Sequence, residues 1–269
     1  MAEFSAKDVQ ALRNATGAGM LDAKRALTAA DGDPAEAAKW LRERGLGKAA
    51  ERAGRESQEG AVAVAYDAGQ DAIALVQLRS DTDFGAKSPD FVNLVNELAA
   101  LVASEGEDAV DQRKAAIEDL NIAIKENVQL GEVVRFQAAP GNVVGSYLHV
   151  QNDRGVNGVI LELKGGTAEL AHDLAVHIAF GRPKHLRRED VPAEEVEAER
   201  TALETESRRE GKPEAALPKI VDGKLSGWFK RVPGGVLLEQ PYARDDKRTV
   251  AQVLGSAEVV RFAQVVIGG

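Results

Sequence analysis

The chain has 269 residues, a formal net charge of −9 and a hydrophobic content of 44%, which is ordinary for a globular protein with a sizeable core. The negative charge argues against a general nucleic-acid binder. Because the chain contains no cysteine, a disulfide framework, a thiolate zinc site and a cysteine nucleophile are excluded.

The N-terminal segment MAEFSAKDVQ lacks the basic-then-apolar order of a signal peptide. No run of residues approaches the ~18 apolar residues of a membrane span. We therefore expect a cytoplasmic protein that has neither a membrane nor a nucleic acid as its direct partner.

Residues 1–55 form a mildly basic head, with 10 Lys and Arg against 8 Asp and Glu, whereas the remainder holds 24 against 35. Three helix patterns follow one another in this head. The first begins with Ser5 as its cap and ends at Gly17. The second covers MLDAKRALTAA, and the third begins at Pro34 and is expected to end at Gly45, before a helical or flexible linker.

The junction between the first two helices, TGAGM, places Met20 and Leu21 beside two glycines, which allow the backbone to come close to a partner. Two interpretations stay open, a contact surface and burial in the core. A module this small can hardly bury every apolar side chain.

The rest of the chain contains a repeat, because the pentapeptide EVVRF occurs at residues 132–136 and again at 258–262. Upstream of each copy, β-rich runs around a Gly/Asp/Asn turn predict a hairpin, from Gly60 in the first copy and Gly145 in the second. A helix pattern follows each hairpin. We expect an α+β protein with two related antiparallel-sheet halves, residues 56–140 and 141–269.

The two halves differ mainly by two insertions. The first half has about six extra residues between its second strand and its helix, and they are the SDTDF segment at residues 80–84. The second half has about 41 extra residues, which are mostly charged and predict a projecting helical hairpin at about 190–231. Because surface insertions on a rigid scaffold carry sites, we expect function to lie there.

Catalytic motifs are missing from the sequence: it has no GxxxxGK[ST] phosphate loop, no GxGxxG after a strand, no HExxH and no GxSxG. Asp81 and Asp83 share a segment but lack a neighbouring base, nucleophile or metal set. An acid beside an exposed aromatic, Asp83 beside Phe84, fits partner recognition better. The four histidines are interpreted as scattered structural residues, not ligands: His149, His172, His177 and His185.

Five stretches in order resemble the bacterial elongation factor Ts family, the guanine nucleotide exchange factors of elongation factor Tu. They are LRNATGAGMLDAKRAL, TDF at 82–84, DLAVHIAFGRPKHLRREDVP, LLEQPYARDDKRTVAQVL and the closing EVVRF, so the resemblance covers nearly the whole chain. It implies a ubiquitin-associated-like helical head, two homologous core subdomains and a helical hairpin (coiled-coil) insertion in the second.

The resemblance also implies a mechanism. Thr82, Asp83 and Phe84 are expected to push into the nucleotide-binding domain of elongation factor Tu near its magnesium ion, with the phenyl ring wedged between helices. The magnesium and phosphate sites are then disturbed and the nucleotide leaves. Neither a cofactor nor catalytic residues of the chain's own are expected, and the complex is expected to be one-to-one or two-to-two.

Further contacts with elongation factor Tu are implied at positions that match the family. They are Arg13, Met20, Leu21 and Lys24 in the head, and Ile124, Lys125, His149, Ala243 and Arg244 in the core. The sequence departs from the family where Gly85 replaces a usual valine, which predicts a more mobile loop, and where Lys125 replaces a glycine. Ser80 and Ala23 replace frequent cysteines.

Two other functions are compatible with the sequence. One is an adaptor that uses its helical head to hold an unrelated protein or a nascent chain, and the other is an enzyme that uses Asp83 as a general acid or base.

Overall fold

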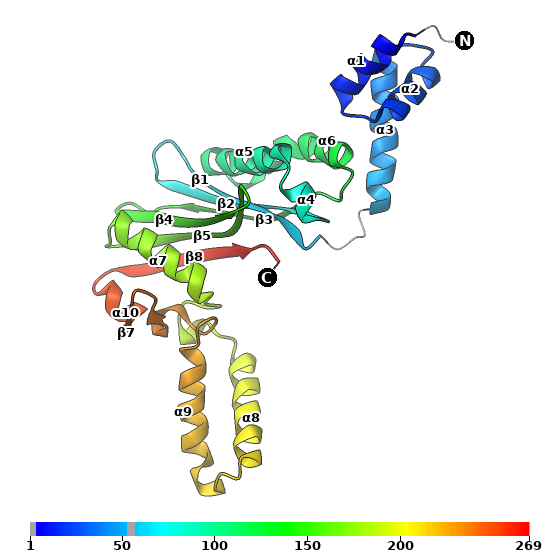
Figure 1. Cartoon of the computed structure of the whole chain (residues 1–269). Coiled ribbons are helices and arrows are strands. Elements are labelled where there is room, and N and C mark those ends of the chain that lie inside the picture. Colours follow the sequence, from blue (N-terminus) through cyan, green and yellow to red (C-terminus); the bar gives the residue numbers. More distant parts are fainter. Residues whose placement is uncertain (1–3, 53–56, 269) are drawn as a thin grey trace.

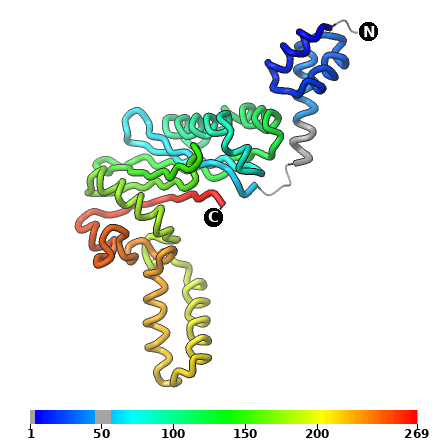
Figure 2. The backbone as a smooth tube through the Cα atoms, in the orientation of Figure 1, coloured from blue at the N-terminus to red at the C-terminus, as the bar shows by residue number. Residues whose placement is uncertain are grey.

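The computed structural model describes residues 4–52 and 57–268 (Figure 1). It combines helices with antiparallel sheets, so the predicted α+β class is confirmed. The path of the chain runs from a helical head through a layered body into a long helical pair and back to the body (Figure 2). In the described part of the chain, every helix is too short or too polar to cross a bilayer.

The head consists of three helices around a small core. The first helix begins and ends at the predicted residues. Ser5 and Asp8 form a capping box at its start, and Gly17 takes the left-handed conformation that ends it. Leu12, Ala23 and Leu27 are buried at their centre. The helices are α1 (Ala6–Thr16), α2 (Met20–Ala29) and α3 (Pro34–Arg52).

The predicted end of the third helix at Gly45 is wrong, because α3 continues to Arg52. Gly45 allows two helices to approach closely: a Cβ atom there would lie 2.7 Å from Ile122 Cγ2 of α6. Arg42 of α3 adds an ion pair with Asp119 of α6 at 2.7 Å. The glycine therefore serves the contact between head and body. Residues 53–56 of the predicted linker lie outside the described residues.

The first part of the body is a three-stranded antiparallel sheet in the order β1-β2-β3. Its strands are β1 (Glu59–Tyr66), β2 (Ala72–Ser80) and β3 (Gln129–Gln137), and its helices are α4 (Asp83–Ala86), α5 (Pro89–Glu105) and α6 (Lys114–Ile124), with a 3-10 turn at Glu107–Arg113. β2 is the central strand and is buried along nearly its whole length, as its continuous apolar run predicts. The hairpin predicted from Gly60 is present as β1 and β2.

The second part repeats this pattern in the order β4-β5-β8. Its strands are β4 (Asn142–Gln151), β5 (Arg154–Lys164) and β8 (Glu258–Val266), and its first helix is α7 (Ala168–Gly181). Both EVVRF segments lie in outer strands, β3 and β8, and each pairs with the central strand of its sheet. The sequence repeat is therefore a repeat of one sheet position.

The two sheets pack face to face. Val62, Ile73 and Leu75 of the first sheet share a buried cluster with Val144 and Ile160 of the second. α5 covers the other face of the first sheet, and α7 covers the other face of the second (Figure 1). The body is therefore a four-layer stack of helix, sheet, sheet and helix.

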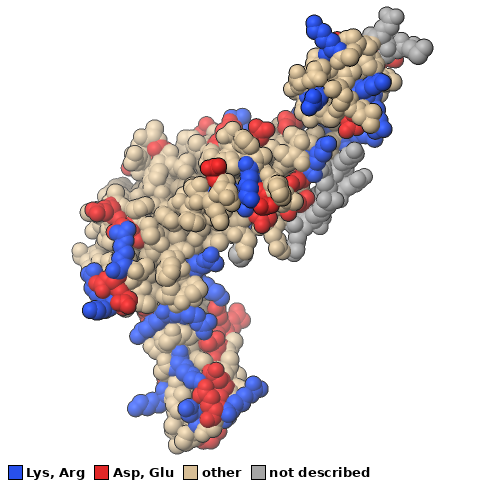
Figure 3. All heavy atoms as spheres, in the orientation of Figure 1, with Lys and Arg blue, Asp and Glu red and all other residues tan. Residues whose placement is uncertain are grey.

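A helical pair projects from the second part of the body (Figure 1). It consists of α8 (Ala193–Arg209) and α9 (Leu217–Phe229), and the chain then returns through β6 (Pro241–Tyr242), β7 (Asp245–Thr249) and α10 (Val250–Leu254). Acidic and basic side chains alternate along the pair (Figure 3), and Lys224 of α9 bridges Glu206 and Glu210. An apolar cluster that includes Leu203, Leu225 and Phe229 packs within the pair and at its base, and the charged side chains cover its surface.

Candidate functional site

The sequence predicts that the SDTDF insertion is an open loop. The structure instead contains a single helical turn there, α4. Thr82 caps this turn: its hydroxyl accepts a hydrogen bond from the Gly85 main-chain N–H at 3.2 Å. The turn begins with Asp83 and Phe84, so these residues occupy a defined backbone conformation.

The Phe84 side chain projects from this turn into solvent and is 84% exposed. Among the large hydrophobic residues that the structure describes, it has the highest exposed fraction. The ring therefore does not pack on its own sheet. A phenylalanine with so little burial in its own protein has apolar area available for contact with another molecule.

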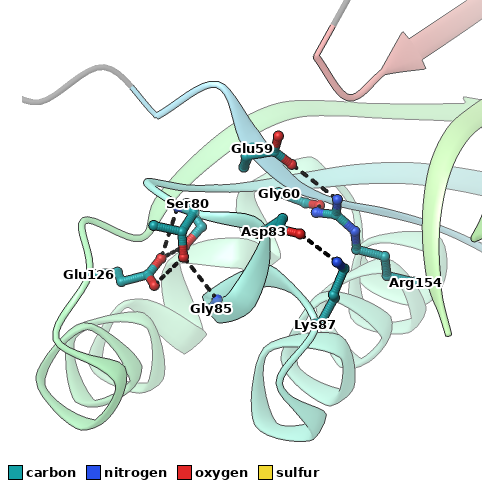
Figure 4. A network of polar contacts seen from close by, with 9 residues as sticks. Glu59, Gly60, Ser80, Asp83, Gly85, Lys87, Glu126 and Arg154 are labelled. Carbon is teal, nitrogen blue, oxygen red and sulfur yellow. Dashed lines mark hydrogen bonds and ion pairs between the residues drawn. The ribbon is translucent and has the colours of Figure 1, made fainter. Parts of the chain in front are cut away.

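Asp83 faces Lys87, one helical turn further on, and the two side chains form an ion pair (Figure 4). The pKa of Asp83 lies below its ordinary value, chiefly because the Lys87 ammonium donates a hydrogen bond to the carboxylate, and the charges of Lys87 and Arg154 act in the same direction. The turn therefore presents an ionised carboxylate beside an exposed ring.

The expectation that Gly85 makes this segment more mobile is not supported, since Gly85 is buried and its N–H is bonded to Thr82. A Cβ atom at this position would lie 2.3 Å from a carboxylate oxygen of Glu126. The glycine makes room for that carboxylate.

The head presents its predicted contact residues to solvent. Met20 is 50% and Leu21 61% exposed at the start of α2, so neither side chain is buried in the core of the head. Arg13 and Lys24 are also exposed. All four predicted contact residues of the head are therefore accessible at its surface.

A groove of about 740 Å³ lies between the α1–α2 junction of the head and α6, beside the contact of α3 with α6. Gly17, Gly19 and Asp22 line it on the head side, and Ile122, Ala123 and Lys125 line it on the body side. The groove therefore brings the glycine-rich head junction close to the predicted contact at Ile124 and Lys125.

Ile124 and Lys125 end α6 just before β3. Ile124 is partly buried against the core of the first sheet, whereas Lys125 is exposed. Lys125 has φ +61°, the left-handed conformation that favours glycine. This explains physically why glycine suits the position.

The remaining predicted contacts lie on the second part of the body. His149 is exposed near the end of β4, and its Nδ1 lies 3.3 Å from the Tyr147 hydroxyl. Ala243 and Arg244 form the turn between β6 and β7, where Arg244 pairs with Asp173 of α7 at 2.7 Å. This turn lies beside α10, well away from α4 and the head (Figure 1). The structure thus does not gather all predicted residues into one cluster.

The other polar groups considered in the sequence are engaged in structural contacts. Asp81 accepts hydrogen bonds from Ser57 Oγ and from the main-chain N–H of Asn127. His172 contacts the Ser146 carbonyl oxygen at 2.8 Å, and His177 is buried. Within the residues that the structure describes, His, Asp and Glu side chains form no group of three that could hold a metal ion.

The sequence did not predict the contacts of three polar residues around α4. Lys87 pairs with Asp83, and Glu126 accepts hydrogen bonds from Ser80 and Thr82 (Figure 4). Arg154, at the start of β5, donates to the Gly60 carbonyl and to Glu59 at 3.0 Å. The four-residue spacing of Lys87 from Asp83 was the available signal for the first, whereas the other two depend on contacts distant in sequence.

Comparison with known proteins shows the family of the chain. The model of the family described as elongation factor TS matches residues 81–269. Over the full length of both chains, the sequence is 43% identical to elongation factor Ts of Renibacterium salmoninarum and 42% identical to that of Streptomyces griseus. It is 41% identical to elongation factor Ts of Clavibacter michiganensis, again over both full lengths. This chain therefore belongs to the elongation factor Ts family, the exchange factors of translation elongation.

Proposed function

We propose that this chain binds elongation factor Tu and promotes the release of its GDP. The observation that carries the proposal is Phe84, which is 84% exposed on a capped helical turn beside the ionised Asp83. Burying a phenylalanine contributes roughly 1.5–3 kcal/mol, so a partner gains from accepting this ring. The neighbouring carboxylate adds an oriented charge where the family likeness implies a magnesium site.

Disturbance of the nucleotide site follows from the family mechanism. Phe84 enters between helices of the nucleotide-binding domain. Asp83 gives up its ion pair with Lys87, and its carboxylate then competes for groups around the magnesium ion. Thr82 holds the start of the turn through its cap. Magnesium and phosphate contacts weaken together, and GDP dissociates without any bond being broken by this chain.

The spread of the remaining residues favours a large partner. Met20 and Leu21 are exposed on the head, whereas Ala243 and Arg244 lie at the far side of the body. Arg13, Lys24, Ile124, Lys125 and His149 add further contacts between them. A protein as large as a multidomain GTPase can span these points, and a small-molecule substrate cannot. The complex acts in the cytoplasm, without direct contact to nucleic acid or membrane.

The test is the release of fluorescent GDP from purified elongation factor Tu, with and without the chain. We expect faster release, and no hydrolysis of GDP or GTP by the chain itself when it is assayed without elongation factor Tu. Binding without acceleration would instead favour the adaptor, and turnover of nucleotide would favour the enzyme. Sedimentation of the complex distinguishes one-to-one from two-to-two assembly.

Calorimetry provides a second, independent test, because coupling between two binding sites is reciprocal. If the chain weakens the affinity of elongation factor Tu for GDP, GDP must weaken its affinity for the chain by the same factor. A cycle without this mutual weakening would refute the mechanism.

A further inference from the structure

Glu126 directly follows the predicted contact at Ile124 and Lys125, and its carboxylate reaches across to the start of α4 (Figure 4). One oxygen accepts hydrogen bonds from Ser80 Oγ at 2.5 Å and from the Thr82 main-chain N–H at 3.1 Å. The other accepts the Thr82 hydroxyl at 2.5 Å. A carboxylate 44 residues away in sequence thus holds Thr82, the residue that caps the exposed turn.

These bonds form a directed chain. The Thr82 hydroxyl donates a hydrogen bond to Glu126 and accepts one from the main-chain N–H of Gly85. Asp83 and Phe84 lie between these two anchored residues. Hydrogen bonds to a carboxylate oxygen are stronger than those between neutral groups, and this bond orients the Thr82 hydroxyl for its capping role.

The fit around the carboxylate is close. A Cβ atom at Gly85 would lie 2.3 Å from Glu126 Oε2 and 2.7 Å from Oε1. The carboxylate therefore fills the space beneath the turn, and α4 rests directly on it. Any larger residue at position 85 would displace either the turn or Glu126.

The internal repeat supplies a comparison within the same chain. The two EVVRF segments begin at residues 132 and 258, and the residue six positions before the second is Gln252, which corresponds to Glu126. Gln252 is exposed and only caps its own helix, accepting the Thr249 main-chain N–H at 2.8 Å. The half without an exposed Phe-bearing turn thus has an uncharged residue in a purely local role.

We propose that Glu126 is a positioning residue, which holds the Asp83–Phe84 turn in its protruding orientation and ties it to the neighbouring contact at Ile124 and Lys125. This inference rests on the proposed exchange function. By fixing the turn, Glu126 keeps Phe84 in the orientation from which it acts once the complex has formed, so its loss reduces the rate within the complex more than the affinity. Its action is on the geometry of Phe84 and not on the nucleotide itself.

The test compares Glu126→Ala and Glu126→Gln with Gln252→Ala, the matched change in the other half. GDP release from elongation factor Tu is measured over a range of chain concentrations, which separates the maximal rate from the half-saturating concentration. Backbone amide relaxation of residues 82–86 reports the mobility of the turn without any partner. Melting temperatures show the folded fraction of each variant.

We expect Glu126→Ala to lower the maximal rate about tenfold, the size of effect that losing a hydrogen bond to a charged group produces, with a smaller change in half-saturation. The amides of the turn become more mobile. Glu126→Gln keeps one acceptor oxygen and is intermediate. Gln252→Ala lowers the melting temperature slightly and leaves the maximal rate and the turn unchanged.

The proposal is overturned if Glu126→Ala leaves the turn rigid, or if its loss of rate vanishes after correction for the unfolded fraction. Failure of the exchange function is distinguishable, since the unmodified chain would then not accelerate GDP release at all. In that event the amide mobility of Glu126→Ala alone decides whether Glu126 positions the turn.

Discussion

At the scale of single residues, Phe84 and Asp83 contribute different physical properties to one exposed turn. The ring supplies apolar area and makes few contacts of its own, and the carboxylate supplies charge that Lys87 balances in the free protein. Their effects on folding and on binding can therefore be separated by substitution.

Replacing Phe84 by alanine should weaken the complex with elongation factor Tu by roughly 1.5–3 kcal/mol, or about 10- to 150-fold. The melting temperature should hardly change, because the ring is 84% exposed in the free chain. Calorimetric titration and thermal unfolding measure the two quantities. Phe180, which is 65% exposed on α7, is the matched control, and Phe180→Ala should leave binding intact. A strong loss of stability with normal exchange would show that Phe84 is structural.

Lys125 has φ +61° at the end of α6, a left-handed conformation that is unfavourable for a residue with a side chain. The left-handed conformation costs about 1–2 kcal/mol for a residue with a side chain, and glycine loses about 0.5–1 kcal/mol more backbone entropy. Lys125→Gly should therefore raise the free energy of unfolding by about 0.5–1 kcal/mol. Urea denaturation measures it, and Lys125→Ala, which keeps a Cβ atom, should show no such gain.

At the scale of elements, a buried network joins the end of α7 to the base of the projecting helical pair. Gln240 is fully buried, and its amide donates to the carbonyl oxygens of Gly181 at 2.8 Å and of Arg231 at 3.0 Å. Its side-chain oxygen accepts from His177 Nε2 at 3.0 Å. His177 Nδ1 accepts the Ala243 main-chain N–H at 3.1 Å, so the neutral ring holds the β6–β7 turn in place.

Burial lowers the pKa of His177, although its hydrogen bond to Gln240 acts in the opposite direction. Because the folded chain binds this proton less readily than the unfolded chain, stability is complete above the ordinary histidine pKa of about 6.5 and falls as the pH drops below it. One such group changes the free energy of unfolding by at most about 1.4 kcal/mol per pH unit. Urea denaturation at pH 7.5 and 5.5 measures this loss.

Two variants isolate the role of His177 in that pH dependence. His177→Gln should be less stable at both pH values but should lose less between them. His172→Gln, at a more exposed histidine of the same helix, should keep the full pH dependence. An unchanged slope in His177→Gln would contradict the assignment.

At the scale of the whole molecule, the head and the body differ in how they are joined. The two sheets share a buried cluster that includes Leu75 and Ile160, whereas the head reaches the body through α3 and α6. We propose three units, residues 1–55, 56–140 and 141–269, of which the last two fold together. The helical pair predicted at about 190–231 is part of the last unit.

Deleting residues 1–55 should therefore leave a cooperatively folded body while weakening the complex, because Met20 and Leu21 are removed. Thermal unfolding checks the first statement and titration against elongation factor Tu the second. The control is Met20→Ala with Leu21→Ala in the full chain, which removes the exposed contact and keeps the α3–α6 packing. Loss of cooperative unfolding on deletion would count against this division.

Local sequence signals predicted much of this molecule, because they depend on neighbouring residues. The cap at Ser5, the end at Gly17, the hairpins and the repeated edge strand follow from residue type and spacing. The exposure of Phe84 also followed from the sequence, since the insertion that carries it has no counterpart in the second half.

The tertiary structure decided the meaning of several residues whose local signals were ambiguous. Gly45 lies inside a helix and lets Ile122 of α6 approach it, and Gly85 is buried with Glu126 in the space beside it. Lys125 is left-handed because α6 must turn into β3 there. The sequence by itself indicated the head helices, the hairpins and the exposure of Phe84. Only packing between segments distant in the chain determined how that phenylalanine is held.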